Sequence, residues 1–193
     1  LSVWAKFVTV PEDAKAVEVV GQQWAWSYRF PGKDGQLGAS DSKLITVDNP
    51  FGMDPKDPAG QDDHLVLNNE LHLPIGQPVR MLLRAKDVNH QFAVPQFRVK
   101  MDMVPGMVTY FWLTPTRTGS YDVLCEQLCG VAHFAMRGRV VVDEQPAFDT
   151  WLAAQPTYAK AVATSKGDPE AGKALFVACS ACHGAQAEGN REV

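Results

Sequence analysis

Long apolar runs are missing from this sequence of 193 residues. No stretch approaches the roughly 20 consecutive apolar residues that a membrane-spanning helix needs, and residues 1–20 lack the apolar core of a signal peptide. An initiating methionine is also missing, since the chain begins with LSVWAKFVTV. We therefore expect further sequence upstream of Leu1 in the complete protein.

An excess of basic charge is lacking as well. The formal net charge is −4, charged residues make up 21% of the chain, and the lysines and arginines are scattered. A nucleic-acid partner is therefore not expected, because binding to phosphates needs a concentrated positive surface. By contrast, 46% of the residues are hydrophobic, which is enough for one or two folded domains with a real core.

Cysteine is scarce, and the four cysteines occur as two close pairs, Cys125 with Cys129 and Cys179 with Cys182. A disulfide framework would distribute its cysteines so that they link distant segments. Here each pair has histidine nearby, which indicates metal or cofactor chemistry instead.

Long helical patterns are absent from the first 140 or so positions, where short β-branched and aromatic segments alternate with Pro, Gly and Asn. About eight such segments predict an all-β antiparallel sandwich. The predicted strands are 17–30, 43–49, 64–69, 79–85, 91–99, 107–114, 120–125 and 137–143.

The pattern becomes helical at residues 143–155. There Phe148, Trp151 and Leu152 share one helical face, and Asp149 could cap the start of the helix. This short helix closes the predicted first domain.

The segment CEQLCGVAHFAM, residues 125–136, carries Cys125, Cys129, His133 and Met136. Their spacing fits one face of a helix, so a buried core stripe is one interpretation. Gly130 and the strand-like sequences on both sides favour a loop instead.

Three kinds of metal site could use this loop. Two Cys and two His would satisfy tetrahedral Zn²⁺, but the thioether of Met136 suits copper better. A single blue-copper site needs only one Cys, so the second thiolate suggests that both sulfurs bridge two coppers. The second histidine would be His90, in the upstream segment DVNHQF.

The loop resembles the CuA domain of cytochrome c oxidase subunit II, and the similarity covers nearly all of residues 3–155. Three segments carry it in the same order: VGQQWAWSYRFPG, DVNHQFAVPQFRVKMDMVPG and PTRTGSYDVLCEQLCGVAHFAMRG. The resemblance implies a cupredoxin-like Greek-key β-sandwich over residues 1–155.

The resemblance also implies a role for each donor. Cys125 and Cys129 would bridge the two coppers. His90 and a weak Met136 would complete one copper, and His133 with the backbone carbonyl of Gln127 would complete the other. The family usually has Glu at the Gln127 position, where its carboxylate can also hold Mg²⁺, so this second role is not implied for the present chain.

The same resemblance assigns Trp24 as the side chain through which electrons first arrive, above the copper loop. Trp26 and Tyr28 follow at a spacing of two, which places all three on one face of a strand. We interpret Trp26 as packing. Thiolate bridges delocalise one electron over both coppers, so the bond changes on reduction are small and electron transfer is favoured over substrate chemistry.

A second motif, CSACH at residues 179–183, has the C-x-x-C-H pattern of c-type haem attachment. Cys179 and Cys182 would form the thioether bonds and His183 would be the proximal iron ligand. A redox dithiol is the alternative. The segment GDPEAGKALFVACSACHG resembles the N-terminal helix of class I cytochrome c, with Pro169 near the helix start.

Residues 169–193 are therefore predicted to be the first part of a cytochrome c domain, joined by a linker over residues 156–168. The chain ends ten positions after His183 and has no methionine beyond Met136, so the sequence does not supply a distal methionine ligand to the haem iron.

The two motifs together resemble subunit II with a fused C-terminal cytochrome c, as in caa3-type bacterial oxidases. That resemblance implies a fragment without its membrane hairpin, on the periplasmic face of the inner membrane. Its partners would be oxidase subunit I and, as electron donor, cytochrome c or the fused haem domain. The alternatives are the CuA domain of a nitrous oxide reductase-like enzyme and a mononuclear copper-binding or delivery module.

Overall fold

The computed structural model describes residues 1–46, 48–164, 172–173, 176–177, 180 and 184. Residues 1–159 form one compact unit, and residues 160–193 belong to a second. The predicted haem residues Cys179, Cys182 and His183 lie outside the described part of the chain.

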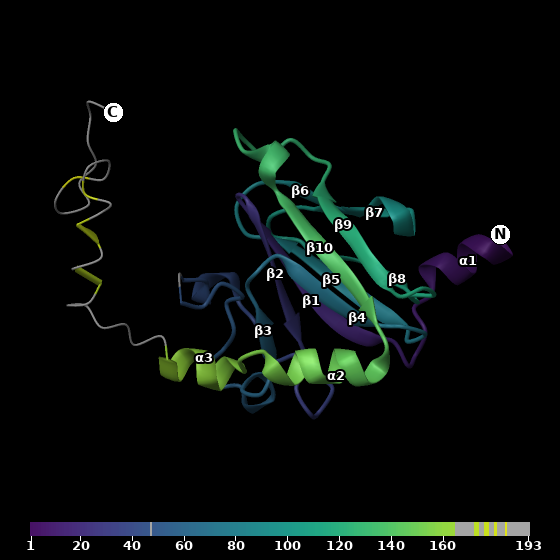
Figure 1. Ribbon diagram of the computed structural model, residues 1–193, viewed down its shortest axis with the longest axis horizontal. Coiled ribbons are helices and arrows are strands. Elements are labelled where there is room, and N and C mark those ends of the chain that lie inside the picture. The colour runs from purple at the N-terminus through teal and green to yellow at the C-terminus, as the bar shows by residue number, and fades with distance from the viewer. Residues whose placement is uncertain (47, 165–171, 174–175, 178–179, 181–183, 185–193) are drawn as a thin grey trace. The chain divides into compact units, whose positions relative to one another are not determined.

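Two five-stranded sheets form the first unit (Figure 1). The order of strands in one sheet is β3-β2-β1-β5-β8, and in the other it is β4-β10-β9-β6-β7. The strands are β1 Lys15–Gln22, β2 Ala25–Phe30, β3 His64–Val66, β4 Glu70–Pro74, β5 Val79–Ala85, β6 His90–Val94, β7 Val99–Met103, β8 Thr109–Leu113, β9 Gly119–Cys125 and β10 Arg137–Asp143.

Helices are few and short among the described residues. They are α1 Ser2–Val8, α2 Gln145–Ala154 and α3 Tyr158–Thr164, with single 3-10 turns η1 Ser42–Leu44, η2 Pro58–Gly60, η3 Pro95–Phe97 and η4 His133–Ala135. None of the helices in this part of the chain has the length and apolar character needed to cross a lipid bilayer.

The predicted sandwich is confirmed, but its strands are not all antiparallel. β1 pairs with β5 and β10 pairs with β4 in parallel, while the other pairs are antiparallel. The first predicted strand is in fact the β1–β2 hairpin, which turns at Gln23 and Trp24. Trp24 therefore precedes β2 and does not share a strand face with Trp26 and Tyr28.

Two other strand predictions need correction, and one strand, β4, was not predicted. Pro95 divides the segment predicted as one strand into β6 and β7, because proline cannot donate to a sheet ladder. The 43–49 segment forms no strand among its described residues; it begins in η1, where the Asp41 carboxylate accepts a hydrogen bond from Lys43 N–H. Strand β4, ELHLP, has only two strongly apolar residues and ends in proline, so the sequence pattern did not predict it.

The core lies between the two sheets and is built from both. Trp26 and Tyr28 are fully buried in it, so the interpretation of Trp26 as packing is confirmed. Helix α2 begins at Gln145, with Pro146 in its first turn; the prediction that Asp149 caps its start is wrong. Phe148 and Trp151 of α2 pack against Phe30 at centroid distances of 5.9 and 5.6 Å.

A buried ionic network fastens the long connection between β2 and β3. The Arg29 guanidinium donates to Glu18 at 2.6 Å and to Asp63 at 2.8 Å, and all three residues are at least 96% buried. Arg29 also donates to the carbonyl of Gly38 at 2.9 Å, and Gly38 N–H donates to Asp63. The connection is therefore held to β1 and β2 by charged groups rather than by strand pairing.

Candidate metal centre

The donor residues of the predicted copper site lie at one end of the second sheet. His90 opens β6, Cys125 closes β9, and the loop from Glu126 to Met136 joins β9 to β10. Because β6 pairs with β9 through Phe92 and Cys125, the sheet itself brings His90 beside Cys125, although 35 positions separate them.

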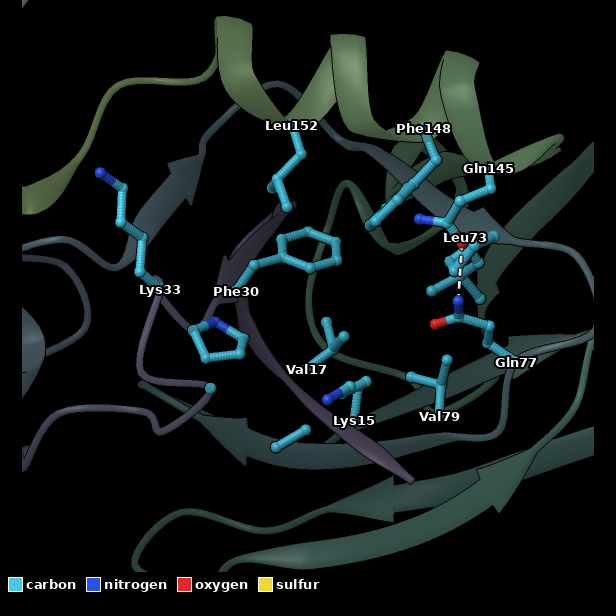
Figure 2. Close-up of a pocket in the computed structure, with 15 residues that line it drawn as sticks. Lys15, Val17, Phe30, Lys33, Leu73, Gln77, Val79, Gln145, Phe148 and Leu152 are labelled. Carbon is cyan, nitrogen blue, oxygen red and sulfur yellow. Dashed lines mark hydrogen bonds between the residues drawn. The ribbon is translucent and has the colours of Figure 1, made fainter. Parts of the chain in front are cut away.

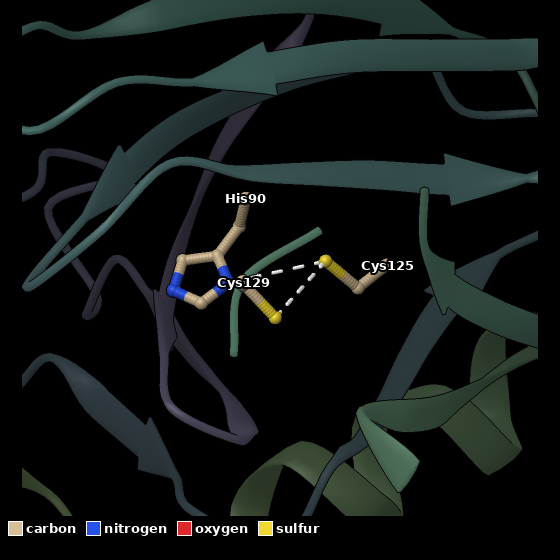
Figure 3. Close-up of side chains that lie close together, drawn as sticks. All are labelled: His90, Cys125 and Cys129. Carbon is tan, nitrogen blue, oxygen red and sulfur yellow. Dashed lines mark hydrogen bonds between the residues drawn. The ribbon is translucent and has the colours of Figure 1, made fainter. Parts of the chain in front are cut away.

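The two cysteine sulfurs lie 3.8 Å apart, and neither is in a disulfide (Figure 3). The Cys125 sulfur is 3.9 Å from Nδ1 of His90 and 3.2 Å from the carbonyl oxygen of Gln127. One donor atom each from His90, Cys125 and Cys129 falls within 4.8 Å of the others.

The remaining two donors face Cys129. Its sulfur lies 3.5 Å from Nδ1 of His133 and 3.8 Å from the thioether sulfur of Met136. Cys129 and Met136 are buried, and His133 is half-buried. The structure thus gathers all six sequence-predicted positions: His90, Cys125, Gln127, Cys129, His133 and Met136.

Asp87 orients the ring of His90. The Nε2–H of His90 donates to the Asp87 carboxylate at 2.8 Å, which leaves Nδ1 as the lone-pair nitrogen facing Cys125. Burial acts to raise the pKa of Asp87. Hydrogen bonds from Gln23 N–H, His90 and Val88 N–H outweigh that effect, so the pKa lies below its ordinary value. Asp87 is thus a carboxylate at neutral pH and acts only as an acceptor.

Burial, and to a smaller extent the neighbouring Cys125, raises the pKa of the Cys129 thiol to about 11. Without metal, Cys129 is therefore a neutral thiol at neutral pH. A metal ion must displace that proton to bind the sulfur as thiolate, which soft metals do readily.

Backbone and side-chain contacts hold the loop in place. Cys125 N–H donates to the carbonyl of Met136, and Met136 N–H donates to the carbonyl of His133. From the β1–β2 turn, the Gln23 side chain donates to the carbonyl of Cys129 at 2.7 Å. The loop is therefore anchored to both sheets.

Trp24 lies against this loop. A Cβ added to Gly130 would approach Cζ2 of Trp24 to 3.2 Å and the Gln23 side chain to 2.8 Å, and φ of Gly130 is +125°. Glycine is thus needed at this position both for its backbone conformation and for the close approach of the indole. Around the loop, the side chains of Leu128, Val131 and Phe134 are 77%, 88% and 80% exposed.

Sequence reasoning missed the supporting residues Asp87 and Gln23. Asp87 stands three positions before His90, a spacing that could have identified it as the acceptor for the second ring nitrogen. Gln23 gave no such signal, because its contact with Cys129 spans 106 positions and depends on the β1–β2 turn.

The donor set of this site contains two thiols, two imidazoles, one thioether and one carbonyl. This combination suits copper rather than Mg²⁺ or Ca²⁺, which prefer oxygen ligands. The sequence-family model named cytochrome c oxidase subunit II, periplasmic domain, matches residues 15–144 of this chain, which include every one of these donors.

The chain belongs to the cytochrome c oxidase subunit II family.

Relatives within the family cover most of this chain. The alternative cytochrome c oxidase subunit 2 of Bradyrhizobium diazoefficiens is 58% identical over 159 residues, which are 82% of this chain and 57% of that protein. Cytochrome c oxidase subunit 2 of Thermostichus vulcanus is 35% identical over 135 residues, or 70% of this chain and 32% of that protein. The chain thus spans little more than half the length of the first of these relatives.

Solved structures support the same fold. The periplasmic domain of subunit II (CoxB) of Bradyrhizobium japonicum matches with a TM-score of 0.55 at 28% identity, covering 75% of this chain and 95% of that one. A mixed disulfide intermediate between a thioredoxin-like protein and subunit II matches with a TM-score of 0.51 at 26% identity, covering 79% and 96%. The predicted cupredoxin-like sandwich is consistent with both.

We expect Asp87→Ala to weaken copper binding by about 10- to 100-fold, the usual effect of removing the hydrogen-bond partner of a metal-ligating histidine. Competition with a copper chelator of known affinity would measure it. Asp87→Asn keeps an acceptor for Nε2–H and should lose much less. Equal affinity in the alanine variant and the parent would show that Asp87 does not orient His90.

Proposed function

We propose that this chain is the electron-transfer part of a haem-copper terminal oxidase. It would accept electrons from cytochrome c at a dinuclear CuA centre and pass them to haem in subunit I, where oxygen is reduced. The observation that carries the proposal is the placement of two free thiols 3.8 Å apart between two imidazole nitrogens and a thioether. The periplasmic face of the bacterial inner membrane is the location that fits this role.

When bound, the copper pair would supply a one-electron redox couple. The protein's own residues determine how that couple behaves. Cys125 and Cys129 would be the shared thiolates, with His90 and His133 as terminal ligands and Met136 and the Gln127 carbonyl as weaker donors. Since each sits on a strand end or an anchored loop, ligand positions would change little between oxidation states, which favours fast electron transfer.

A mononuclear copper-binding or delivery module fits these residues less well. One copper with a Cys, two His and an axial Met would leave a second buried thiol, 3.8 Å away, without a role. The CuA domain of a nitrous oxide reductase-like enzyme would have the same donors, but the match to the subunit II model favours the oxidase.

We also propose covalent haem c at Cys179 and Cys182, with His183 as an axial ligand. The support is the C-x-x-C-H sequence and the helical pattern before it. In this arrangement, as in caa3-type oxidases, the fused haem domain would be an electron donor in addition to external cytochrome c.

Trp24→Phe tests the electron-transfer role. Trp24 lies against Gly130 in the copper loop, so removing its indole should slow reduction of the copper-loaded chain by ferrocytochrome c. We expect a loss of roughly tenfold or more, which corresponds to about 1.4 kcal/mol of activation free energy. Stopped-flow absorbance would measure it.

The control is Trp4→Phe, because Trp4 is 65% exposed on α1 and should leave the rate unchanged. Equal rates for Trp24→Phe and the parent would remove Trp24 from the path of the electron. A copper-loaded parent that ferrocytochrome c does not reduce at all would contradict the proposed donor.

Oxidation of the cysteine pair should block copper loading. The sulfurs are close enough that a small movement would join them, with loss of two protons and two electrons to an added oxidant. We expect oxidised apo-protein to bind no copper until a dithiol reductant restores both thiols, as measured by thiol titration and metal analysis. Full copper uptake without free thiols would contradict the ligand assignment.

One of the matching solved structures is a mixed disulfide intermediate between a thioredoxin-like protein and subunit II. We therefore propose a thioredoxin-like protein as the reductant of an oxidised Cys125–Cys129 pair in this chain. A thioredoxin-like enzyme should therefore restore copper uptake to the oxidised chain at lower concentration than a small dithiol does.

A further inference from the structure

The two sheets are joined differently at the two ends of strand β10. Where β10 ends, a cavity of about 260 Å³ lies beneath helix α2 and is lined by residues of both sheets (Figure 2). Where β10 begins, the turn between β1 and β2 reaches across by hydrogen bonds to the segments that carry the copper donors. One residue of that turn, Gln23, makes two of these bonds.

Gln23 contacts both of these segments through groups other than the donor atoms themselves. Its backbone N–H donates to one oxygen of the Asp87 carboxylate at 2.7 Å, and the other oxygen accepts from Nε2–H of His90 at 2.8 Å. The side-chain Nε2 of Gln23 donates to the carbonyl oxygen of Cys129 at 2.7 Å. Gln23 is therefore one hydrogen bond away from Cys129 and two hydrogen bonds away from His90.

The turn is held in place independently of the Gln23 side chain. Gln22 and Ala25 are paired across the hairpin. Lys86 N–H donates to the carbonyl of Gly21 at 2.9 Å, and Nζ of Lys86 donates to Oε1 of Gln22 at 3.1 Å. Gln23 itself is exposed, so a change of its side chain would remove the contact with Cys129 while the backbone contact with Asp87 remains.

The Cys129 carbonyl is a sensitive point of the copper loop. It belongs to the peptide group that leads into Gly130, whose φ is +125° and whose added Cβ would lie 2.8 Å from Nε2 of Gln23. The same Cβ would lie 3.2 Å from Cζ2 of Trp24, the next residue of the turn. Because the orientation of this peptide group determines where the Cys129 side chain points, the hydrogen bond fixes the Cys129 sulfur relative to both His90 and Trp24.

We propose that Gln23 is a positioning residue of the copper centre, whose side chain keeps Cys129 at a fixed place relative to His90 and Trp24. This role depends on the dinuclear centre proposed above. The net contribution of one neutral hydrogen bond corresponds to about a two- to tenfold change in an equilibrium constant. Without this bond, Cys129 would shift relative to His90, and the two coppers would no longer share the unpaired electron equally.

Gln23→Met tests this role, because methionine has a similar length and no N–H group. We expect a chelator of known affinity to remove copper about two- to tenfold more readily than from the parent. The hyperfine structure in electron paramagnetic resonance should change from two equivalent coppers to two inequivalent ones. The urea midpoint of the metal-free protein should stay at the parent value, since Gln23 is exposed; a residue that only supported the fold would lower it.

Gln22→Met is the matched control, because it breaks the contact with Lys86 in the same hairpin and should leave both copper readouts unchanged. Unchanged copper affinity and hyperfine structure in Gln23→Met would overturn the proposal. An equal loss in Gln22→Met would overturn it as well, because the hairpin as a whole would then support the site. A parent with a single copper would contradict the proposed function instead, and the chelator competition would still test Gln23 on that copper.

Discussion

Cys125→Ser should reduce the copper content of the reconstituted chain from two ions to one or fewer and remove any mixed-valence signal. The hydroxyl of serine is a hard, weakly acidic donor that cannot replace a bridging thiolate. Cys125 sits at the centre of the cluster, 3.8 Å from the Cys129 sulfur and 3.9 Å from His90 Nδ1, so its loss disconnects the two halves of the site. Metal analysis with electron paramagnetic resonance on the same sample measures both effects.

The matched control is Cys179→Ser, which changes a cysteine of the haem motif and should leave copper content unaltered. The near-UV circular dichroism of Cys125→Ser without metal should match that of the parent, because the side chains have similar size. Two coppers and an intact mixed-valence signal in Cys125→Ser would contradict the assignment of Cys125 as a bridge.

Arg29→Ala should lower the free energy of unfolding by about 3–5 kcal/mol, the cost of leaving a buried charge without its partner. Asp63 is fully buried and would keep only its backbone donors, Gly32 and Gly38. Glu18 would keep its contact with Arg84 at 2.6 Å, so most of the loss arises at Asp63. Urea unfolding of the reduced, metal-free protein, followed by tryptophan fluorescence, measures it without the added stability of bound metal.

Two controls accompany this variant. Lys100→Ala breaks an ion pair with Glu126 whose side chains are 63% and 38% exposed, and such pairs contribute about 0–1 kcal/mol. Arg29→Lys keeps the charge but lacks the planar fork that reaches both carboxylates, so its stability should be intermediate. A change below about 1 kcal/mol in Arg29→Ala would show that water or rearrangement solvates Asp63 in its place.

The copper donors could be predicted from sequence because most of them lie in one short loop. Cys125, Cys129, His133 and Met136 fall within twelve positions, and the flanking β-branched segments predicted β9 and β10. His90 was predicted because the site needs a second histidine from another segment, and the family resemblance assigned the same residue; the pairing of β6 with β9 supplies the physical reason. No local pattern could have supplied that pairing.

The errors have a common origin in tertiary structure. Residues 17–30 are rich in β-branched and aromatic side chains, and the turn at Gln23 and Trp24 itself contains no Gly, Pro, Asn or Asp that would mark it. The parallel pairing of β1 with β5 joins segments that are more than 50 positions apart, and hydrophobic alternation does not encode strand direction. Likewise, the Arg29 network is invisible in the sequence, since isolated charges there resemble a solvated surface.

Electron paramagnetic resonance of the oxidised, copper-loaded chain, with metal analysis on the same sample, decides whether the centre is dinuclear. We expect two copper ions per chain and hyperfine structure from two equivalent coppers sharing one unpaired electron. A one-copper hyperfine pattern, a silent Cu(I) protein or bound zinc would contradict the dinuclear centre, and with it the electron-transfer role.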